Sequence, residues 1–212
     1  MLAFSSGFTA SGDITSGLVG YYPCTEGSGS TIADTTATVG DMVFTGPVSW
    51  GASWVSLPGT SAASTTRTWT LSAGQAFSFT AALRLNAANS DTWRVVYDAT
   101  SGNYPQLWFT NISSLVDGRL LFDATGYETA GSFIGTWVHV SVSKPAGTSV
   151  ATYYINGSAT TGVNSYATAA INLTFFRRGT ASYFYGDARR IRLYNRAITP
   201  SEVAVIYGLD AI

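Results

Sequence analysis

Two carboxyl groups held roughly 5 to 10 Å apart can hydrolyse a glycosidic bond, so the acidic residues are the first to test for chemistry. The chain has three glutamates, Glu26, Glu128 and Glu202, and each is isolated in the sequence. We therefore predict that the protein is not an enzyme. Catalysis by scattered aspartates is kept as a third alternative for the function, although Asp in Gly-rich segments commonly serves turn geometry. The aspartates concerned are Asp91, Asp98, Asp117 and Asp123.

The chain contains one histidine, His139, and one cysteine, Cys24. His139 stands in an alternating pattern on the same face as Trp137 and Ser141, and no Gly-x-Ser-x-Gly motif offers a serine nucleophile. A lone histidine is only one member of a catalytic set, so we predict a structural role with its hydrogen bonds satisfied. A single cysteine forms no intramolecular disulfide, and we predict that Cys24 packs as a small hydrophobic residue.

Three expected loops combine an aromatic residue with amides or carboxylates: Asn89–Trp93, Asn103–Gln106 and Gly126–Glu128. This combination suits a sugar, because an aromatic ring stacks on its apolar face while polar groups bind its hydroxyls. The alternative is that the aromatics only clamp the loops to the domain. The candidate ligand-binding residues are Tyr104, Asn103, Tyr127 and Trp93.

Positive charge is concentrated near the end of the chain. Residues 177–196 contain six arginines and one acidic residue, Asp187, which gives this segment about +5 and the rest about −6 within a net charge of −1. One interpretation is solvated strand faces with ion pairs to Asp34 or Asp123. The other is a docking patch for an acidic glycan or a carboxylate-bearing partner surface.

The arginines of the last strand differ in the face that they are expected to occupy. Side chains alternate across a strand, so Arg190 and Arg192 are predicted to share one outer face. Arg189 has the parity of the apolar Ile191 and Leu193. Arg190 and Arg192 are therefore the candidate partner-docking residues.

Alternation of apolar and polar residues indicates the elements that position these side chains. It is clearest from Phe77 to Leu85, where every odd-numbered residue is apolar, and it recurs in short runs up to Leu193. Turn signals such as Asn156-Gly157 separate the runs. Many short strands with Gly-rich turns predict an all-β fold, an antiparallel two-sheet β-sandwich with one short C-terminal helix.

The expected helix spans residues 199–207, with Thr199 as N-cap, Pro200 in the first turn, Glu202 completing a capping box and Gly208 ending it. Residues 1–16 have no strong pattern and are predicted to form an N-terminal arm or leader. Residues 17–212 are predicted to form one β-sandwich domain.

Three blocks of sequence, residues 17–34, 137–157 and 186–202, occur in an order typical of a known family. The first is similar to that family's first strand, the second to its central strands with an Asn-Gly turn, and the third to its last strand and closing helical turn. Together they resemble the laminin G-like, concanavalin A-like jelly-roll domains. The resemblance implies a jelly-roll sandwich whose large aromatics belong to the core. These aromatics are Tyr22, Trp137, Tyr154 and Tyr194.

Many members of that family bind calcium through an Asp- and Asn-rich loop after the first strand. Here the loop retains Asp34 and Asp41, but Thr and Ala replace its Asn-rich interior. Where relatives often carry an acidic pair before the last strand, this chain has Arg189 and Arg190. We therefore predict no metal and no cofactor, with calcium kept as the alternative.

The near-neutral charge argues against nucleic acid as a partner, and the absence of a long apolar run argues against membrane insertion. The resemblance implies a non-catalytic, lectin-like recognition module that binds a glycan or protein surface. Domains of this family usually belong to exported chains, yet this chain begins at Met without a signal peptide. A phage product that is assembled in the host cytoplasm and released by lysis would reconcile both facts. We therefore predict an extracellular or virion-surface location, with display on a phage. The second alternative is a structural decoration or tail protein that docks on capsid or tail proteins through residues 1–16. A homo-oligomer is compatible with either alternative.

Overall fold

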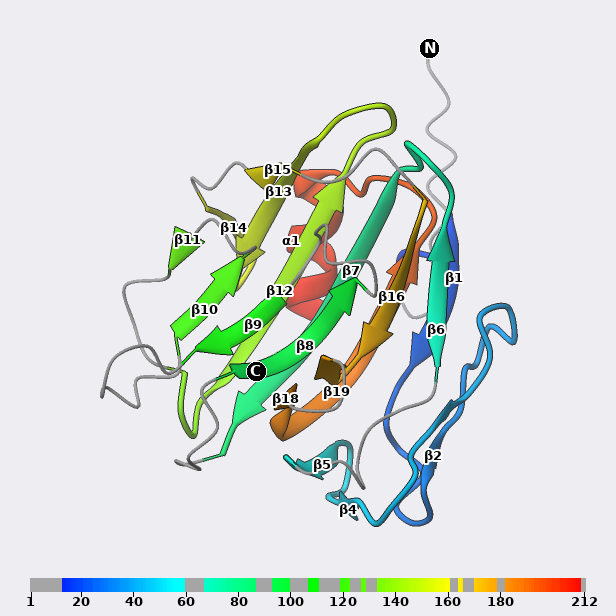
Figure 1. The fold of residues 1–212 in the computed structure, drawn as a ribbon, viewed down its shortest axis with the longest axis vertical. Coiled ribbons are helices and arrows are strands. Elements are labelled where there is room, and N and C mark those ends of the chain that lie inside the picture. The colour runs from blue at the N-terminus through cyan, green and yellow to red at the C-terminus, as the bar shows by residue number, and fades with distance from the viewer. Residues whose placement is uncertain are drawn as a thin grey trace.

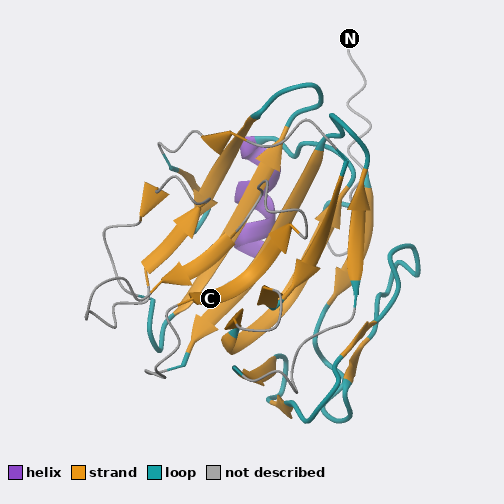
Figure 2. Cartoon of the chain, viewed as in Figure 1, coloured by secondary structure: helices purple, strands orange, loops and turns teal. Residues whose placement is uncertain are grey.

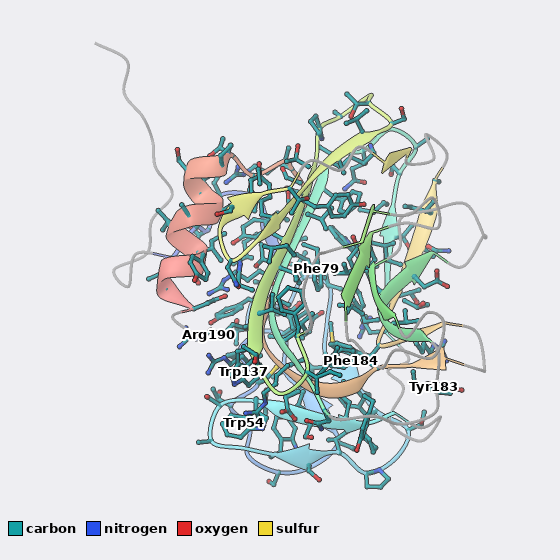
Figure 3. The ribbon with its side chains drawn as sticks, turned by 90° about the vertical axis from the view of Figure 1, so that its left-hand side faces the viewer. Trp54, Phe79, Trp137, Tyr183, Phe184 and Arg190 are labelled. Carbon is teal, nitrogen blue, oxygen red and sulfur yellow. The ribbon has the colours of Figure 1, made fainter. Side chains whose placement is uncertain are left out.

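The protein is a sandwich of two antiparallel β-sheets with a helix packed on the outside of the larger sheet (Figure 1). The computed structural model describes residues 13–59, 67–86, 93–99, 107–110, 119–122, 127–128, 133–160, 164–165, 170–178 and 182–210. Strands dominate it (Figure 2), and Figure 3 shows the helix, the larger sheet and the smaller sheet as successive layers. The predicted fold class is confirmed. In the part of the chain described here, no helix has the length and apolar character to cross a membrane.

The larger sheet has nine strands in the order β14-β13-β12-β7-β19-β5-β4, with β1 also paired to β19 and β15 to β13. The central strand β7 pairs with both β12 and β19 along most of its length. The Asn156-Gly157 turn closes the hairpin between β13 and β14 with positive φ at both residues. The strands are β1 (Leu18–Tyr22), β4 (Ser49–Trp50), β5 (Val55–Pro58), β7 (Phe77–Leu85), β12 (Trp137–Lys144), β13 (Val150–Ile155), β14 (Ser158–Ala159), β15 (Asn164–Ser165) and β19 (Tyr185–Tyr194).

The smaller sheet has the order β11-β10-β9-β8-β16-β6. Its strands are β6 (Thr68–Leu71), β8 (Trp93–Ala99), β9 (Leu107–Thr110), β10 (Arg119–Phe122), β11 (Tyr127–Glu128) and β16 (Ile171–Phe175). Two short strand pairs accompany the sheets. They are β2 (Thr31–Ile32) with β3 (Met42–Val43), and β17 (Arg177–Arg178) with β18 (Ser182–Tyr183).

The main hydrophobic core lies between the two sheets. The odd-numbered residues of β7, from Phe77 to Leu85, all belong to it, as their alternation predicts. The Phe79 ring centroid is 5.1 Å from that of Tyr97 on β8 and 6.2 Å from that of Phe175 on β16. Figure 3 shows Phe79 between the layers. Because these rings come from opposite sheets, their packing holds the sandwich together.

A second, smaller cluster lies on the outer face of the larger sheet, beneath α1 (Pro200–Leu209). Val203 and Ile206 of the helix pack there with Tyr154 of β13 and Tyr194 of β19. Both tyrosines are buried, as predicted, but beneath the helix and not inside the sandwich. The outer face of this sheet therefore has a covered region under α1.

The helix begins as predicted and ends later than predicted. Thr199 and Glu202 form a capping box, in which the Thr199 Oγ1 atom accepts from the Glu202 N–H group at 3.2 Å and the Glu202 carboxylate accepts from the Thr199 N–H group at 2.7 Å. The prediction that Gly208 ends the helix is wrong, because the helix continues to Leu209 with Asp210 as its C-cap. A glycine inside a helix costs only about 1 kcal/mol, and the Asp210 N–H group donates to the Ile206 carbonyl at 2.9 Å, which continues the helical hydrogen bonding past Gly208.

Two serines of the larger sheet hold the segment that leads into the helix. The Ser78 hydroxyl donates to the Arg196 carbonyl at 2.8 Å and accepts from the Ile198 N–H group at 3.0 Å. The Ser143 hydroxyl donates to the Ile198 carbonyl at 2.7 Å. These bonds fix the start of α1 over β7 and β12.

Residues 13–16 contact the β-sandwich directly. Ile14 belongs to the cluster beneath α1, and its carbonyl accepts a hydrogen bond from the Tyr194 hydroxyl at 3.1 Å. Asp13 pairs with Arg192 at 3.3 Å. Residues 1–12 of the predicted arm lie outside the described residues, so an arm stays a prediction for them.

A β-bulge at Arg190 changes which residues of β19 face outward. The pairing of β19 with β7 slips between Arg189 and Arg192, and Arg190 has a φ of +51°. An extra residue in a strand reverses the alternation beyond it. Ala188 and Ile191 therefore both point into the core, while Arg189 lies on the outer face. The prediction that Arg189 shares the parity of Ile191 is wrong.

Candidate functional site

The predicted ligand-binding residues lie largely outside the described part of the structure. Asn103 and Tyr104 are not among the described residues. Trp93 is the first residue of β8 and Tyr127 the first of β11, so both belong to strands of the smaller sheet and not to loops. Their side chains are not described either. A ligand site at these four residues stays a prediction.

Arg192 is buried beneath α1, which corrects its assignment to an exposed docking patch. Its side chain is 2% exposed, and Nη1 donates to both carboxylate oxygens of Asp210 at 3.0 Å. Its Nη2 atom lies 3.3 Å from Asp13 Oδ2. The sheet and the helix exclude water from this guanidinium, and the two aspartates compensate its charge. Its partners are therefore Asp13 and Asp210 and not the predicted Asp34 or Asp123.

Arg190 and Arg196 are also engaged within the fold. Arg190 donates through Nη1 to the Leu209 carbonyl and lies 3.5 Å from Asp210 Oδ1, with its side chain 37% exposed. Arg196 forms a two-bonded pair with Glu202 at 2.6 and 2.9 Å. The basic segment is thus divided among separate contacts. A docking role for Arg190 stays a prediction.

His139 and Cys24 are both completely buried. The His139 ring lies under Tyr207 of the helix, with ring centroids 5.7 Å apart, and its Nε2 atom is 3.3 Å from Asp210 Oδ2. Neither ring nitrogen has a hydrogen bond of good geometry within the described residues, so the ring is buried as predicted but is not fully hydrogen-bonded. Burial raises the pKa of the Cys24 thiol, as expected for a cysteine packed as a small hydrophobic residue.

Asp34 organises its loop through hydrogen bonds and does not fit a calcium site. Its carboxylate accepts from the backbone N–H groups of Tyr21, Thr36, Val39 and Gly40 at 2.9 to 3.0 Å. Calcium would need these oxygens facing a cation, whereas donors surround them here. Within the described ranges, no group of three or more His, Cys, Asp or Glu side chains is placed to hold a metal.

A group of aromatic and charged side chains occupies the outer face of the larger sheet beyond the C-terminal end of α1. Trp137 of β12, Arg84 of β7 and Asp187 of β19 lie side by side across three neighbouring strands. Two residues before Arg84 in β7, and on the same face, Ala82 pairs with His139 of β12 and with Arg189 of β19. The small Ala82 side chain leaves room for Arg189 to reach across β7 towards Trp137.

We call this group, with Trp54, the tryptophan–arginine cluster. The Arg84 guanidinium carbon is 4.9 Å from the Trp137 ring centroid and 5.4 Å from that of Trp54. The Arg189 guanidinium carbon is 4.4 Å from the Trp137 centroid. Arg84 is also paired with Asp187 at 2.6 Å. Cation–π contacts at these distances hold Trp137 in one orientation.

Trp54 reaches the cluster from the turn between β4 and β5. Its carbonyl accepts from the Gly51 N–H group at 2.9 Å, and its indole lies directly over Gly51. A Cβ atom at residue 51 would come within 2.0 Å of the Trp54 ring, so only glycine fits there. The turn places the Trp54 ring edge-on to Trp137, with centroids 6.2 Å apart, and Figure 3 shows both rings below the helix.

Beside Trp137 the surface is hollowed. The hollow has a volume of about 420 Å³ and is lined by Gly135, Thr136, Trp137, Asn156 and Tyr207. This size is within the range of clefts that bind small molecules. The Asn156 side-chain oxygen accepts from the His139 N–H group at 2.9 Å, which fixes the amide, and its nitrogen has no hydrogen-bond partner within the described residues. An aromatic wall with an amide and a hydroxyl beside it is suited to a sugar.

The charges around the cluster and the neighbouring end of α1 do not cancel. In the described part of the chain, four arginines face three aspartates here, and Arg189 is the one without a carboxylate partner. Its Nε atom is buried without a hydrogen bond. Burial, and then the neighbouring Arg190, lowers the pKa of Arg189. The arginines are Arg84, Arg189, Arg190 and Arg192, and the aspartates are Asp13, Asp187 and Asp210.

The predictions from the sequence placed Trp137 in the core and Arg189 on the same side of the strand as Ile191 and Leu193. They therefore missed this cluster. Trp137 is in fact half-buried on the outer face. One signal was available, because Trp137 alternates with the apolar Val138 and Val140 and must face away from them. The bulge that turns Arg189 outward leaves no comparable trace in the sequence.

Comparison with protein families places the chain in the concanavalin A-like lectin/glucanases superfamily. The family model with that description, a laminin G model, matches residues 51–204, which is more than half of the chain. The chain therefore belongs to this family. A comparison with curated proteins gave no match.

Solved structures resemble the chain at low sequence identity, which shows the fold alone. Trypanosoma rangeli sialidase, in complex with 2,3-difluorosialic acid, has a TM-score of 0.71 at 15% identity, covering 93% of this chain and 34% of the sialidase chain. The chain thus spans about a third of that enzyme. Domain 4 of AbnA, a GH43 extracellular arabinanase from Geobacillus stearothermophilus in complex with arabinotriose, has a TM-score of 0.58 at 17% identity, with 90% and 98% coverage. The binding domain of Paraclostridial Mosquitocidal Protein 1 has a TM-score of 0.62 at 16% identity, with 90% and 52% coverage.

Proposed function

We propose that this protein is a non-catalytic glycan-binding module and that Trp137, with the hollow beside it, receives the sugar. The observation that carries the proposal is a half-buried tryptophan, fixed by two arginines, in the wall of a hollow that also contains Asn156 and Tyr207. The apolar face of a pyranose or furanose packs on an aromatic ring, and its hydroxyls bind the amide and the tyrosine hydroxyl. Domain 4 of the arabinanase, which shares the fold, was solved with arabinotriose.

The carboxylates near Trp137 favour binding over hydrolysis. Asp187 is 2% exposed and paired with Arg84, and Asp210 is fully buried against Arg192. A glycosidase needs a carboxylic acid and a second carboxylate on either side of the scissile bond. Neither aspartate is free to reach a sugar in the hollow, so a bound glycan is expected to stay intact.

A glycan array tests the proposal directly. The wild-type protein is expected to bind a defined set of glycans, and Trp137→Ala is expected to weaken that binding at least tenfold, because the stacking surface is lost. Tyr104→Ala and Tyr127→Ala serve as matched controls for the loop site predicted from the sequence. Thermal unfolding of each variant shows that the fold is retained.

Three outcomes would contradict the proposed site or function. Binding that survives Trp137→Ala and disappears with Tyr104→Ala would move the site to the loops. An array without hits would favour the structural alternative, which predicts attachment to capsid or tail particles that is lost when residues 1–16 are removed. Release of shorter sugars from a bound glycan would show an enzyme. Virion display and homo-oligomerisation stay predictions from the sequence.

A further inference from the structure

Within the described residues, Arg189 differs from its neighbours in having no salt bridge to a carboxylate. Arg84 has Asp187 at 2.6 Å, Arg192 has Asp210 at 3.0 Å, and Arg190 has Asp210 at 3.5 Å. Arg189 instead contacts the Trp137 ring, and the nearby Asp210 carboxylate acts on it only as a more distant charge. Among the described residues, no carboxylate pairs directly with this positive charge, so water or a ligand can do so.

The surroundings of Arg189 make an anionic ligand favourable. The side chain is half-buried, its Nε–H group has no acceptor within the described residues, and the positive charges of Arg190 and Arg84 are only partly offset by Asp210. The lowered pKa of Arg189 has the same causes, since burial and the neighbouring cations disfavour its charge. The Nε–H group is buried, so an incoming carboxylate would pair with the terminal Nη groups of Arg189 and balance the excess charge there.

The neighbouring aspartates do not compete for Arg189. Asp187 is 2% exposed and bonded to Arg84 through both Nε and Nη2, at 2.7 and 2.6 Å. Asp210 is fully buried, and its oxygens accept from Arg192. Either carboxylate would have to abandon a charged partner to reach Arg189.

Arg189 lies next to the proposed glycan site, because it contacts Trp137, although Arg189 itself does not line the hollow. Its guanidinium carbon is 4.4 Å from the ring centroid of Trp137, and Trp137 forms part of the wall of the hollow. A guanidinium stacked on an indole loses little further freedom when it pairs. Its two adjacent N–H groups match the two oxygens of a carboxylate.

We infer that the glycan bound at Trp137 is acidic, with a carboxylate on its sugar that pairs with Arg189. The inference rests on the proposed function, since it assigns the ligand class of the same site. Uronic and sialic acids both provide the required chemistry, a ring with an apolar face and a carboxylate attached to it. A neutral sugar would leave the guanidinium without its anion.

The test compares each acidic glycan with an uncharged form of the same shape. Uronate- and sialate-terminated glycans are arrayed beside their methyl esters and neutral parent sugars, and the strongest acidic probe is then titrated by calorimetry. We expect the acid to bind at least tenfold more tightly than its methyl ester, because a charge-assisted pair is lost in the ester. Added salt is expected to reduce this preference.

Variants of Arg189 decide whether this residue provides the preference. Arg189→Gln is expected to bind the acid and its ester equally. Arg189→Lys is expected to keep part of the preference, because lysine keeps the positive charge but loses the paired N–H donors of the guanidinium. Arg177→Gln on β17 is the matched control, since it removes the same charge elsewhere and should leave the preference unchanged. Thermal unfolding confirms that each variant is folded.

The outcomes separate this inference from the proposed function. Equal binding of acid and ester by the wild type, with binding lost in Trp137→Ala, would overturn the acidic ligand and leave glycan binding intact. A preference for the acid that survives Arg189→Gln would also overturn the inference. The absence of binding to any glycan would overturn both.

Discussion

Single residues on the larger sheet show how buried charge is tolerated in this fold. Arg192 and Asp210 form an ion pair with side chains 2% and 0% exposed, a setting in which desolvation opposes the attraction. Asp13 adds a second carboxylate and Asp210 borders His139, so the pair is part of a network. Such a network stabilises one arrangement of the helix over the sheet, because any shift would leave a charge unpaired.

Asp34 gives a prediction for stability against acid. Burial raises the pKa of Asp34, but hydrogen bonds from the Gly40 and Tyr21 N–H groups and from Thr36 outweigh that effect, so the pKa lies below its usual 3.8. A pKa that is lower in the folded state means that the ionised group stabilises the fold above pH 3.8. This stabilisation is lost as the pH falls through the pKa of the folded state.

Asp34→Asn is therefore expected to lower the free energy of unfolding at neutral pH by about 1 to 3 kcal/mol. The loss of stability on acidification below pH 3.8 should become shallower in the variant, because the titrating group is gone. Urea unfolding over a pH series measures both effects. An unchanged slope in the acid range would show that Asp34 does not contribute to acid sensitivity.

At the scale of the elements, local patterns predicted most of the fold. The alternation in Phe77–Leu85 and the capping box of Thr199 and Glu202 depend on neighbours in sequence, and both predictions are confirmed. The bulge at Arg190 depends instead on how β19 fits β7, β5 and β1, so no local signal predicted it. The outward position of Trp137 could be predicted from its alternation with Val138 and Val140, but its contact with Arg189 could not, because that contact depends on the bulge.

Gly157, in the turn between β13 and β14, lies against Tyr207, which lines the hollow of the candidate site. Gly157 has a φ of +78°, and a Cβ atom there would come 2.9 Å from the Tyr207 ring. Gly157→Ala is expected to lower stability by about 1 to 2 kcal/mol through backbone strain. It should also weaken glycan binding, because Tyr207 must move in the wall of the hollow.

Gly147→Ala is the control for this variant, since Gly147 has a φ of +67° and open space around its Cβ position. Gly147→Ala should lower stability through backbone strain alone and leave glycan binding unchanged. Calorimetric unfolding and glycan titration on both variants separate the two effects. Equal binding by both variants would show that the position of Tyr207 does not matter for the ligand.

At the scale of the whole molecule, the larger sheet uses both of its faces. Its inner face packs against the smaller sheet, while its outer face carries α1 over one part and the tryptophan–arginine cluster over another (Figure 3). The helix thus does more than close the chain, because Tyr207 near its end forms part of the hollow. The contacts of α1 that stabilise the fold and the residues of the candidate site therefore lie on the same face of the larger sheet.

Residues 13–16 provide a prediction for the molecule as a whole. Removal of residues 1–12 keeps the Asp13–Arg192 pair and the Ile14 contacts, so the unfolding temperature should stay close to that of the full chain. Removal of residues 1–16 takes away both, and should lower stability by about 3 kcal/mol or more, because a buried charge loses a partner and a buried Ile is lost. Thermal unfolding of the two truncations measures the difference, and equal temperatures would contradict it.

Asp13 and Asp210 both pair with the Arg192 guanidinium, and this affects how the domain could be joined to other domains. Both ends of the described chain reach Arg192, within 3.3 Å and 3.0 Å. A domain whose entry and exit points are neighbours can be inserted into a surface loop of a host protein without forcing the host apart. For the same reason, a circular permutant that joins these ends with a short linker would keep every strand of both sheets.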